Sequence, residues 1–156
     1  MAFPLTTTQT LSTPAAPEAV WRAFERVDQW PTVLPALLTA RLEPEGPLAT
    51  GRSIVTRATP ESKATDITMR VVAAEAPRHL ALAIDDPAYR ATTDYRIVAT
   101  AGGTDVVVTA TLEAIGFKQS VRFLLWQQRL IPMLRQTARE RAQALIDLAE
   151  RIGGAP

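Results

Sequence analysis

Few side chains in this sequence are suited to covalent or metal-dependent chemistry. Cysteine is absent, and histidine occurs once, at His79. The missing thiol excludes cysteine nucleophiles, disulfides and cysteine-bound metal clusters, and one histidine excludes a three-histidine zinc site within one chain. Asp85 and Asp86 precede Pro87, a context typical of a turn rather than of a metal pair. With no serine–histidine–aspartate set and no phosphate-binding glycine loop, we expect no metal and no cofactor, and we assign no catalytic residue.

Three polar residues are candidates for acting on a ligand. Tyr95 shares its alternation with Thr93, so its hydroxyl either anchors a ligand carbonyl or hydroxyl, or bonds to backbone or water at a sheet edge. Arg57 points to the interior if Val55 does, and would then hold an anionic or carbonyl-bearing ligand. Asp66 has the outward parity, which counts against a role for it.

Other polar and aromatic side chains have two interpretations each. Gln128 follows Leu124 by about one helical turn and faces either a cavity or solvent, with solvent slightly favoured. Trp30 follows a helix break, and we expect it to pack in the core and also to line the mouth of a cavity. His79 lies at a hairpin corner, where we expect it to be exposed.

Cations gather in the last third of the chain, between residues 118 and 141. A basic helix of this kind can meet anionic lipid or nucleic acid, but a solvated helix face is the favoured interpretation. The net charge of the whole chain is only +1, and we therefore expect no nucleic-acid partner. The segment carries one acidic residue, Glu140, against Lys118, Arg122, Arg129, Arg135, Arg139 and Arg141.

Length and composition indicate one globular domain spanning residues 1–156. The chain is 47% hydrophobic and 21% charged, which is typical of soluble proteins. No segment approaches the roughly 18 uninterrupted apolar residues of a membrane span, so we expect no integral membrane association. The first residues lack a basic and an apolar signal region, and a cytoplasmic location is therefore expected.

The hydrophobic periodicity predicts an α+β element order. A strand at 3–12 is followed by a helix at 18–27 and a second short helix that ends near residue 34. Period-two alternation then predicts six strands, and a long amphipathic helix covers 118–152, with a kink or interruption at Pro132. These strands lie at about 37–43, 52–58, 64–75, 79–85, 89–100 and 104–114.

Several segments, in this order, resemble those of one superfamily. Residues 17–24 (PEAVWRAF) resemble the opening of its first helix, and residues 27–31 (VDQWP) the start of its second. Residues 46–51, 75–80 and 103–104 resemble a loop, a hairpin and the opening of the last strand. The chain is thereby identified as similar to the helix-grip superfamily (SRPBCC) of START-type lipid-binding domains, birch-pollen-allergen-like proteins and polyketide cyclase/dehydratases.

This resemblance implies a curved antiparallel sheet of about seven strands wrapped around the long C-terminal helix, with an apolar cavity between them. The expected inner face mixes bulky residues with small or weakly polar ones, and the small residues leave volume opposite the helix. The expected ligand-binding residues are Trp30, Leu34, Val55, Arg57, Met69, Leu82, Thr93, Tyr95, Ala110, Leu124 and Gln128.

Three functional hypotheses follow. The first is binding of a small hydrophobic molecule, namely a lipid, a polyketide or an aromatic compound, with a possible homodimer. The resemblance also permits a polyketide cyclase/aromatase or dehydratase, for which Tyr95, Arg57 and Asp66 are the candidate groups. A partner-binding module that uses the basic helix is the third, and nothing in the sequence favours it over the others.

Overall fold

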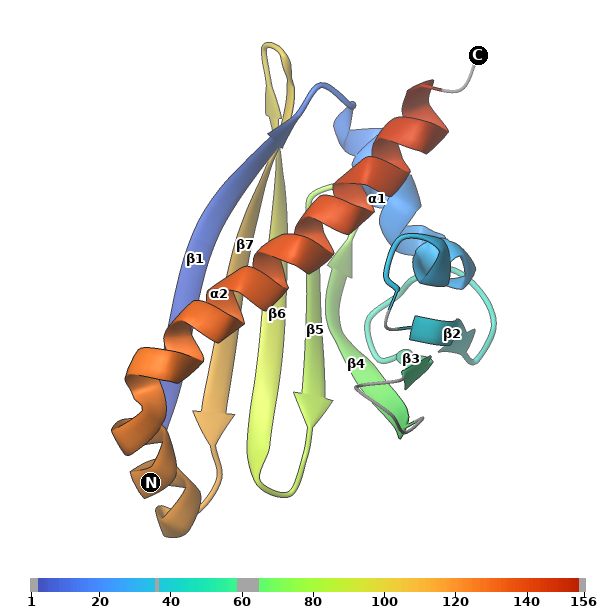
Figure 1. Ribbon diagram of the computed structural model, residues 1–156. Coiled ribbons are helices and arrows are strands. Elements are labelled where there is room, and N and C mark those ends of the chain that lie inside the picture. Colours follow the sequence, from blue (N-terminus) through green and yellow to red (C-terminus); the bar gives the residue numbers. More distant parts are fainter. Residues whose placement is uncertain (1–2, 36, 59–64, 155–156) are drawn as a thin grey trace.

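The chain forms a seven-stranded sheet with a long helix lying across one face (Figure 1). The computed structural model describes residues 3–35, 37–58 and 65–154. Strand β1 (Phe3–Thr13) leads into helix α1 (Pro17–Glu25) and the 3₁₀ helix η1 (Val27–Thr32). Helix α2 (Phe117–Gly154) closes the described chain. Between them lie β2 (Leu37–Glu43), β3 (Ser53–Ala58), β4 (Thr65–Glu75), β5 (His79–Asp85), β6 (Tyr89–Thr100) and β7 (Gly103–Ala114).

All neighbouring strands are antiparallel, and the order in the sheet is β1-β7-β6-β5-β4-β3-β2. Consecutive strands from β2 to β7 pair as hairpins, while β1 pairs with β7. The α+β helix-grip prediction is thus confirmed, and the predicted strands agree with the observed ones to within one or two residues. Residue 64, the expected start of one strand, lies outside the described residues.

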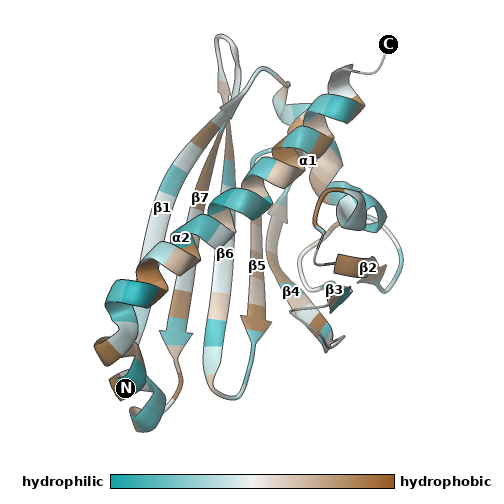
Figure 2. Ribbon diagram, in the orientation of Figure 1, coloured by the Kyte–Doolittle hydropathy of each residue, from teal (hydrophilic) through white to brown (hydrophobic). Residues whose placement is uncertain are grey.

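The two faces of the sheet differ because side chains alternate along each strand. On β6 and β7 the inner positions include Tyr95, Ile97, Val106 and Val108, which are buried, while Arg96 on the outer face is exposed. Hydrophobic and hydrophilic bands therefore alternate along the ribbons in Figure 2. The inner face forms the floor on which the helices pack.

The start of α1 is fixed by its own sequence and by two threonines. Pro17 occupies the first helical turn, where a missing backbone N–H costs nothing, and Glu18 complements the helix dipole. The Thr104 hydroxyl donates to the carbonyl of Ala15 at 2.7 Å, and the Thr13 hydroxyl donates to Glu150 of α2 at 2.8 Å. These bonds join α1, the sheet and the C-terminal end of α2.

The turn between β6 and β7 requires glycine at position 103. Gly103 has φ +147°, and a Cβ built there would lie 2.1 Å from the carbonyl oxygen of Thr13. Any larger residue would collide with this neighbouring backbone. The close approach of β1 to the end of the β6–β7 hairpin therefore depends on this glycine.

Helix α2 runs without interruption through Pro132. Of the two expected effects, the interruption is wrong, and a kink at Pro132 stays a prediction. Proline removes one backbone donor from the helix ladder, but Pro132 lies on the exposed side, where water can satisfy the freed carbonyl. The packing of Ile131 and Leu134, both partly buried, holds the helix against the sheet on either side of it.

Candidate functional site

Helix α2 closes tightly over only part of the inner sheet face. Its closest sheet contacts are with β1 and β7, and it also packs on α1. The C-terminal half of the helix is firmly buried, and its inner side chains enter the main core with Val20 and Phe24 of α1. The buried helix residues are Ala138, Ala142, Leu145, Ile146, Leu148 and Ala149.

The sheet beneath the N-terminal half of α2 is less well covered. Thr93 faces inward, between Leu82 of β5 and Ala110 of β7 in the sheet register. It nevertheless remains partly exposed, as do Ala91 and Leu112 one step further along the same face. An inward side chain keeps solvent contact only where nothing packs against it. The inner face is therefore incompletely covered between these strands and the N-terminal half of α2, and we call this partly uncovered region the hollow.

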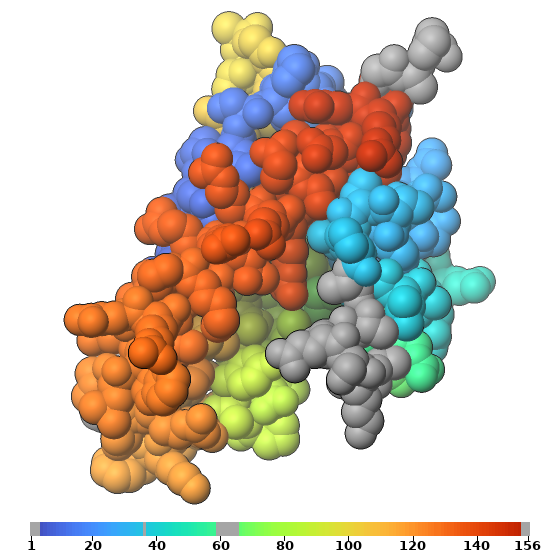
Figure 3. Space-filling model, in the orientation of Figure 1, coloured from blue at the N-terminus to red at the C-terminus, as the bar shows by residue number. Residues whose placement is uncertain are grey.

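The surface view agrees with this description. In Figure 3 the yellow-green strand β6 is visible in a recess beside the orange, N-terminal half of α2. The red, C-terminal half of the helix covers the strands behind it. The hollow thus opens beside residues 117–131 of α2.

The helix side of the hollow is lined by apolar and amide groups. Counting back from Ile131 and Leu134 by helical repeats places Leu124 and Gln127 on the side that faces the sheet. Leu124 is half exposed there, and Gln127 is partly buried. Gln128, the residue expected from the sequence, is exposed at the margin. The repeat from Ile131 is the signal that identifies Gln127 instead.

Tyr95 is a deeply buried polar side chain on this face. It is 4% exposed, and its ring lies 5.1 Å from the ring of Phe24. Burial raises the pKa of the Tyr95 phenol above its ordinary value, and the positive charge of Arg141 partly opposes that rise. Within the described residues the hydroxyl has no hydrogen-bond partner. The phenol therefore stays protonated at neutral pH and keeps a donor for another molecule.

Two further polar groups lie on β1. Gln9 faces inward and donates to the carbonyl of Arg135 on α2 at 2.8 Å, so it connects the sheet to the middle of the helix. Thr7 is buried, and its hydroxyl has no partner among the described residues. In the register Thr7 is opposite Ala110, which is in turn opposite Thr93. Hydroxyl groups thus lie in a row across an otherwise apolar face.

Most of the expected ligand-binding residues share the inner face. Met69, Leu82, Thr93, Tyr95 and Ala110 are at inward positions of β4 to β7. Trp30 is buried in the core, where its indole Nε1 donates to the carbonyl of Ala23 at 3.1 Å. Leu34 packs against the same core cluster. The structure brings these seven residues together around one core, with Leu124 opposite on the helix.

Val55 and Arg57 do not belong to this group. The buried residues of β3 are Ile54, Thr56 and Ala58, so Val55 and Arg57 point to the outer face. Arg57 is exposed and is opposite Asp66 in the register. The sequence analysis assigned the wrong face to alternate residues of β3. With the observed assignment, the side chains of Val55 and Arg57 lie outside the hollow.

Other residues with expected roles also lie on the outer face. His79 is not exposed as expected, because its side chain is 16% accessible and its Nε2 lies 2.6 Å from Asp94 Oδ2. Asp85 is paired with Arg70 and Arg90, whose guanidinium groups lower the pKa of its carboxyl. Asp86 accepts a bond from the backbone N–H of Ala88, as expected of a turn. None of these contacts reaches the hollow.

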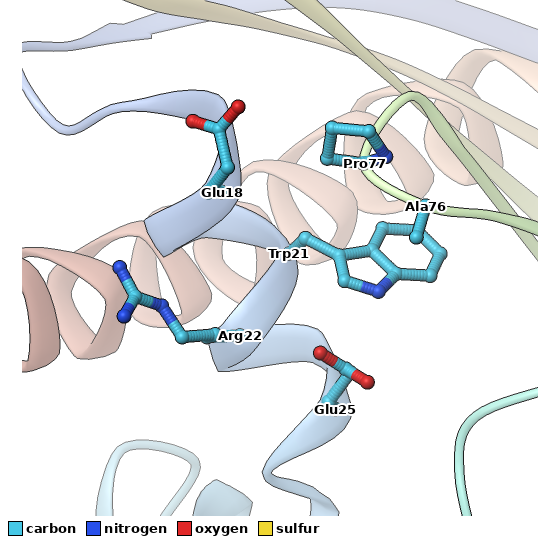
Figure 4. A pocket seen from close by; sticks show the side chains of 6 residues that line it. All are labelled: Glu18, Trp21, Arg22, Glu25, Ala76 and Pro77. Atoms are coloured by element: carbon cyan, nitrogen blue, oxygen red, sulfur yellow. The ribbon is translucent and has the colours of Figure 1, made fainter.

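A shallow pocket lies on the outside of α1 (Figure 4). Its volume is about 450 Å³, and it lies between the helix and the β4–β5 turn at Ala76 and Pro77. Trp21 forms its inner wall and is itself buried. The polar rim consists of Glu18, Arg22 and Glu25. Within the part of the chain that the structure describes, no group of three histidine or carboxylate side chains could hold a metal ion.

The sequence matches one known family. Residues 4–150 match the family described as "Polyketide cyclase / dehydrase and lipid transport". The chain belongs to this family, which confirms the resemblance found in the sequence. No curated protein matches the sequence significantly.

Solved structures with the same fold have low sequence identity to this chain. The structure of Ara h 8.0201 superposes with a TM-score of 0.71 at 16% identity, covering 95% of this chain and 96% of that one. The di-domain ARO/CYC StfQ of the steffimycin biosynthetic pathway gives 0.74 at 14%, covering 97% of this chain and 51% of StfQ. Norcoclaurine synthase from Thalictrum flavum, in complex with dopamine and hydroxybenzaldehyde, gives 0.66 at 11%, with coverages of 94% and 87%.

Proposed function

We propose that the protein binds a small, mostly hydrophobic molecule, such as a lipid, a polyketide or an aromatic compound, between the sheet and the N-terminal half of α2. The observation that carries this proposal is the partial exposure of inward-facing Thr93, Ala91 and Leu112. Apolar pockets with a few fixed polar groups are typical of sites for lipophilic ligands. Membership in a family described by polyketide cyclisation and lipid transport supports the same ligand class.

The polar groups of the site indicate which functional groups the ligand carries. Tyr95 offers a neutral hydroxyl deep in the apolar surface, next to Phe24. The threonine hydroxyl of Thr93 lies in the adjacent row of the same face. We expect a ligand with an apolar body and one carbonyl or hydroxyl directed toward Tyr95.

No specific observation favours catalysis over binding. A cyclase or dehydratase needs an acid or base at the substrate, and Arg57 and Asp66 lie on the outer face. At the described strand positions the inner face carries two titratable side chains, Tyr89 and Tyr95. Tyr95 alone remains from the three groups that the enzymatic hypothesis used. The cytoplasmic location and the lack of a nucleic-acid partner stay predictions.

Substitutions that fill the hollow test this proposal. We expect Thr93→Leu to weaken binding of an environment-sensitive apolar dye, and its displacement by fatty acids or polycyclic aromatics, by about tenfold or more. Thr92→Leu adds the same volume to the outer face of the same strand and should bind the dye as the wild type does. Circular dichroism and urea unfolding show whether both variants fold.

Two results would contradict the proposal. The first is that both variants bind the dye stoichiometrically and as tightly as the wild type. The dye would then bind outside the hollow. The other is no binding of any apolar probe by the folded wild type.

A further inference from the structure

The exposed hydrophobic side chains of this protein are concentrated in and just before the N-terminal half of α2. Of the ten large hydrophobic residues that are exposed, seven lie between residues 115 and 133. Phe117 is 84% exposed, Leu125 74% and Trp126 52%. Orange atoms of this half of α2 form the protruding lower edge of the molecule in Figure 3. A contiguous cluster of exposed hydrophobic side chains on a protein surface is typical of an interaction site.

Leu125, Trp126 and Met133 do not face the hollow. Helical spacing places Leu125, Trp126 and Met133 on the side of α2 opposite Leu124, Gln127 and Ile131. Leu125, Trp126, Gln128 and Arg129 also line a surface groove with a volume of about 360 Å³. We call the surface made by Lys118, Arg122, Leu125, Trp126, Arg129 and Met133 the outer patch of α2.

The charged residues of the outer patch, Lys118, Arg122 and Arg129, are all cations. Between Glu113 and Glu140 the sequence has no acidic residue, and it has five basic ones, at 118, 122, 129, 135 and 139. None of these five forms an ion pair within the described residues. The local charge contrasts with the net charge of +1 for the whole chain. The partner that complements this surface must therefore be both anionic and able to accept apolar side chains.

The geometry of the patch suits a lipid surface. The Arg129 guanidinium lies 5.4 Å from the centre of the Trp126 ring. Tryptophan prefers the level of the lipid headgroups, and arginine can keep its charge among phosphates while its stem and neighbours contact acyl chains. A helix with exposed leucine and aromatic residues beside unpaired cations binds in the plane of anionic membranes.

We propose that the outer patch of α2 docks the protein on an anionic lipid surface. A second copy of the chain is a poorer occupant, because two such patches would bring unpaired cations together without a carboxylate between them. Nucleic acid would complement the positive charge of the patch. Its phosphates, sugars and base edges would not, however, complement the apolar side chains of Leu125 and Met133. No helix within the described residues is long and apolar enough to cross a membrane, so the contact is peripheral.

Docking would place the hollow next to the lipid. Leu124 faces the hollow and Leu125 the outer patch, so one helical segment separates the two. This consequence, exchange of a lipophilic ligand with the membrane, rests on the proposed function. Docking itself does not, and the two can be tested apart.

Vesicle flotation with the full-length protein tests the docking. The probes are phosphatidylcholine vesicles with and without phosphatidylserine, at low and high salt. We expect flotation only with phosphatidylserine, a fall with salt, and a blue shift of the exposed Trp126. Arg122→Gln with Arg129→Gln should lose binding about tenfold or more, and Leu125→Ser with Trp126→Ser should lose it as well.

Matched variants give the controls. Arg26→Gln with Arg151→Gln removes the same charge from exposed positions outside the patch and should leave flotation unchanged. Thr93→Leu should also float normally, which separates docking from ligand binding. Equal flotation without phosphatidylserine, or an equal loss in both charge variants, would overturn the proposal. So would a dimer that Leu125→Ser with Trp126→Ser dissociates, or salt-sensitive binding of DNA with no flotation.

Discussion

The hydroxyl of Thr7 contributes nothing visible to the stability of the fold. It is buried without a hydrogen-bond partner among the described residues, whereas the equally buried Thr56 donates to the carbonyl of Ile67 at 2.8 Å. A buried hydroxyl that leaves water without a new partner is unfavourable, but a paired one is close to neutral or favourable. Two threonines of one sheet face therefore have opposite energetic roles.

Valine substitution measures this difference, because it keeps the shape of threonine and removes the hydroxyl. We expect Thr7→Val to raise the free energy of unfolding by about 1 kcal/mol and Thr56→Val to lower it by about the same amount. Urea unfolding followed by circular dichroism gives both values. A loss of stability in Thr7→Val would mean that the hydroxyl has a partner, such as a bound water molecule, in solution.

For individual residues, the sequence predicts the face of the sheet on some strands and not on others. Inward parity was predicted correctly for Met69, Leu82 and Tyr95, since β4 and β6 alternate between apolar and polar positions and β5 alternates large apolar residues with alanine. Strand β3, with the sequence SIVTRA, places an apolar residue on each face. There the register with β4 decides that Ile54 and Thr56 point inward, and a single strand carries no information about its register.

At the scale of elements, the antiparallel succession from β2 to β7 and the extent of α2 followed from local signals, whereas the pairing of β1 with β7 joins distant segments. Each hairpin has turn chemistry at its ends, and a chain that returns at every turn can form only neighbouring antiparallel strands. The tolerance of α2 for Pro132 did not follow, because tertiary packing outweighs the loss of one helical hydrogen bond. How far α2 lies from the sheet also depends on packing between distant segments.

This interpretation of Pro132 predicts the effect of its removal. Pro132→Ala restores a backbone donor in the middle of α2 at an exposed position, so we expect the free energy of unfolding to rise by about 1 to 3 kcal/mol. Met133→Ala, at the next exposed position, should change it by less than about 0.5 kcal/mol. Chemical denaturation of both variants makes the comparison. If Pro132→Ala were destabilising, the proline would be required for the path of α2 over the sheet.

At the scale of the whole molecule, α2 unites two regions of different packing. Its C-terminal half belongs to the main core with α1, and its N-terminal half lies beside a hollow and carries exposed apolar side chains. Local stability follows the density of buried contacts. The half of the helix that would contact the ligand is therefore also the half that can most easily open, which gives a ligand a route into the hollow.

Hydrogen exchange tests this coupling between packing and binding. In the free protein we expect backbone amides of residues 117–131 to exchange at least about tenfold faster than those of 138–152, because few buried contacts hold the first segment closed. A bound apolar dye should slow exchange in residues 117–131 and in β6 near Thr93, and it should barely alter residues 138–152, whose contacts are already complete. Thr93→Leu, in the presence of the same dye, should keep the pattern of the free protein. Equal protection along the whole of α2 on dye binding would show that the helix opens and closes as one unit, and that the hollow beside its N-terminal half is not where the dye acts.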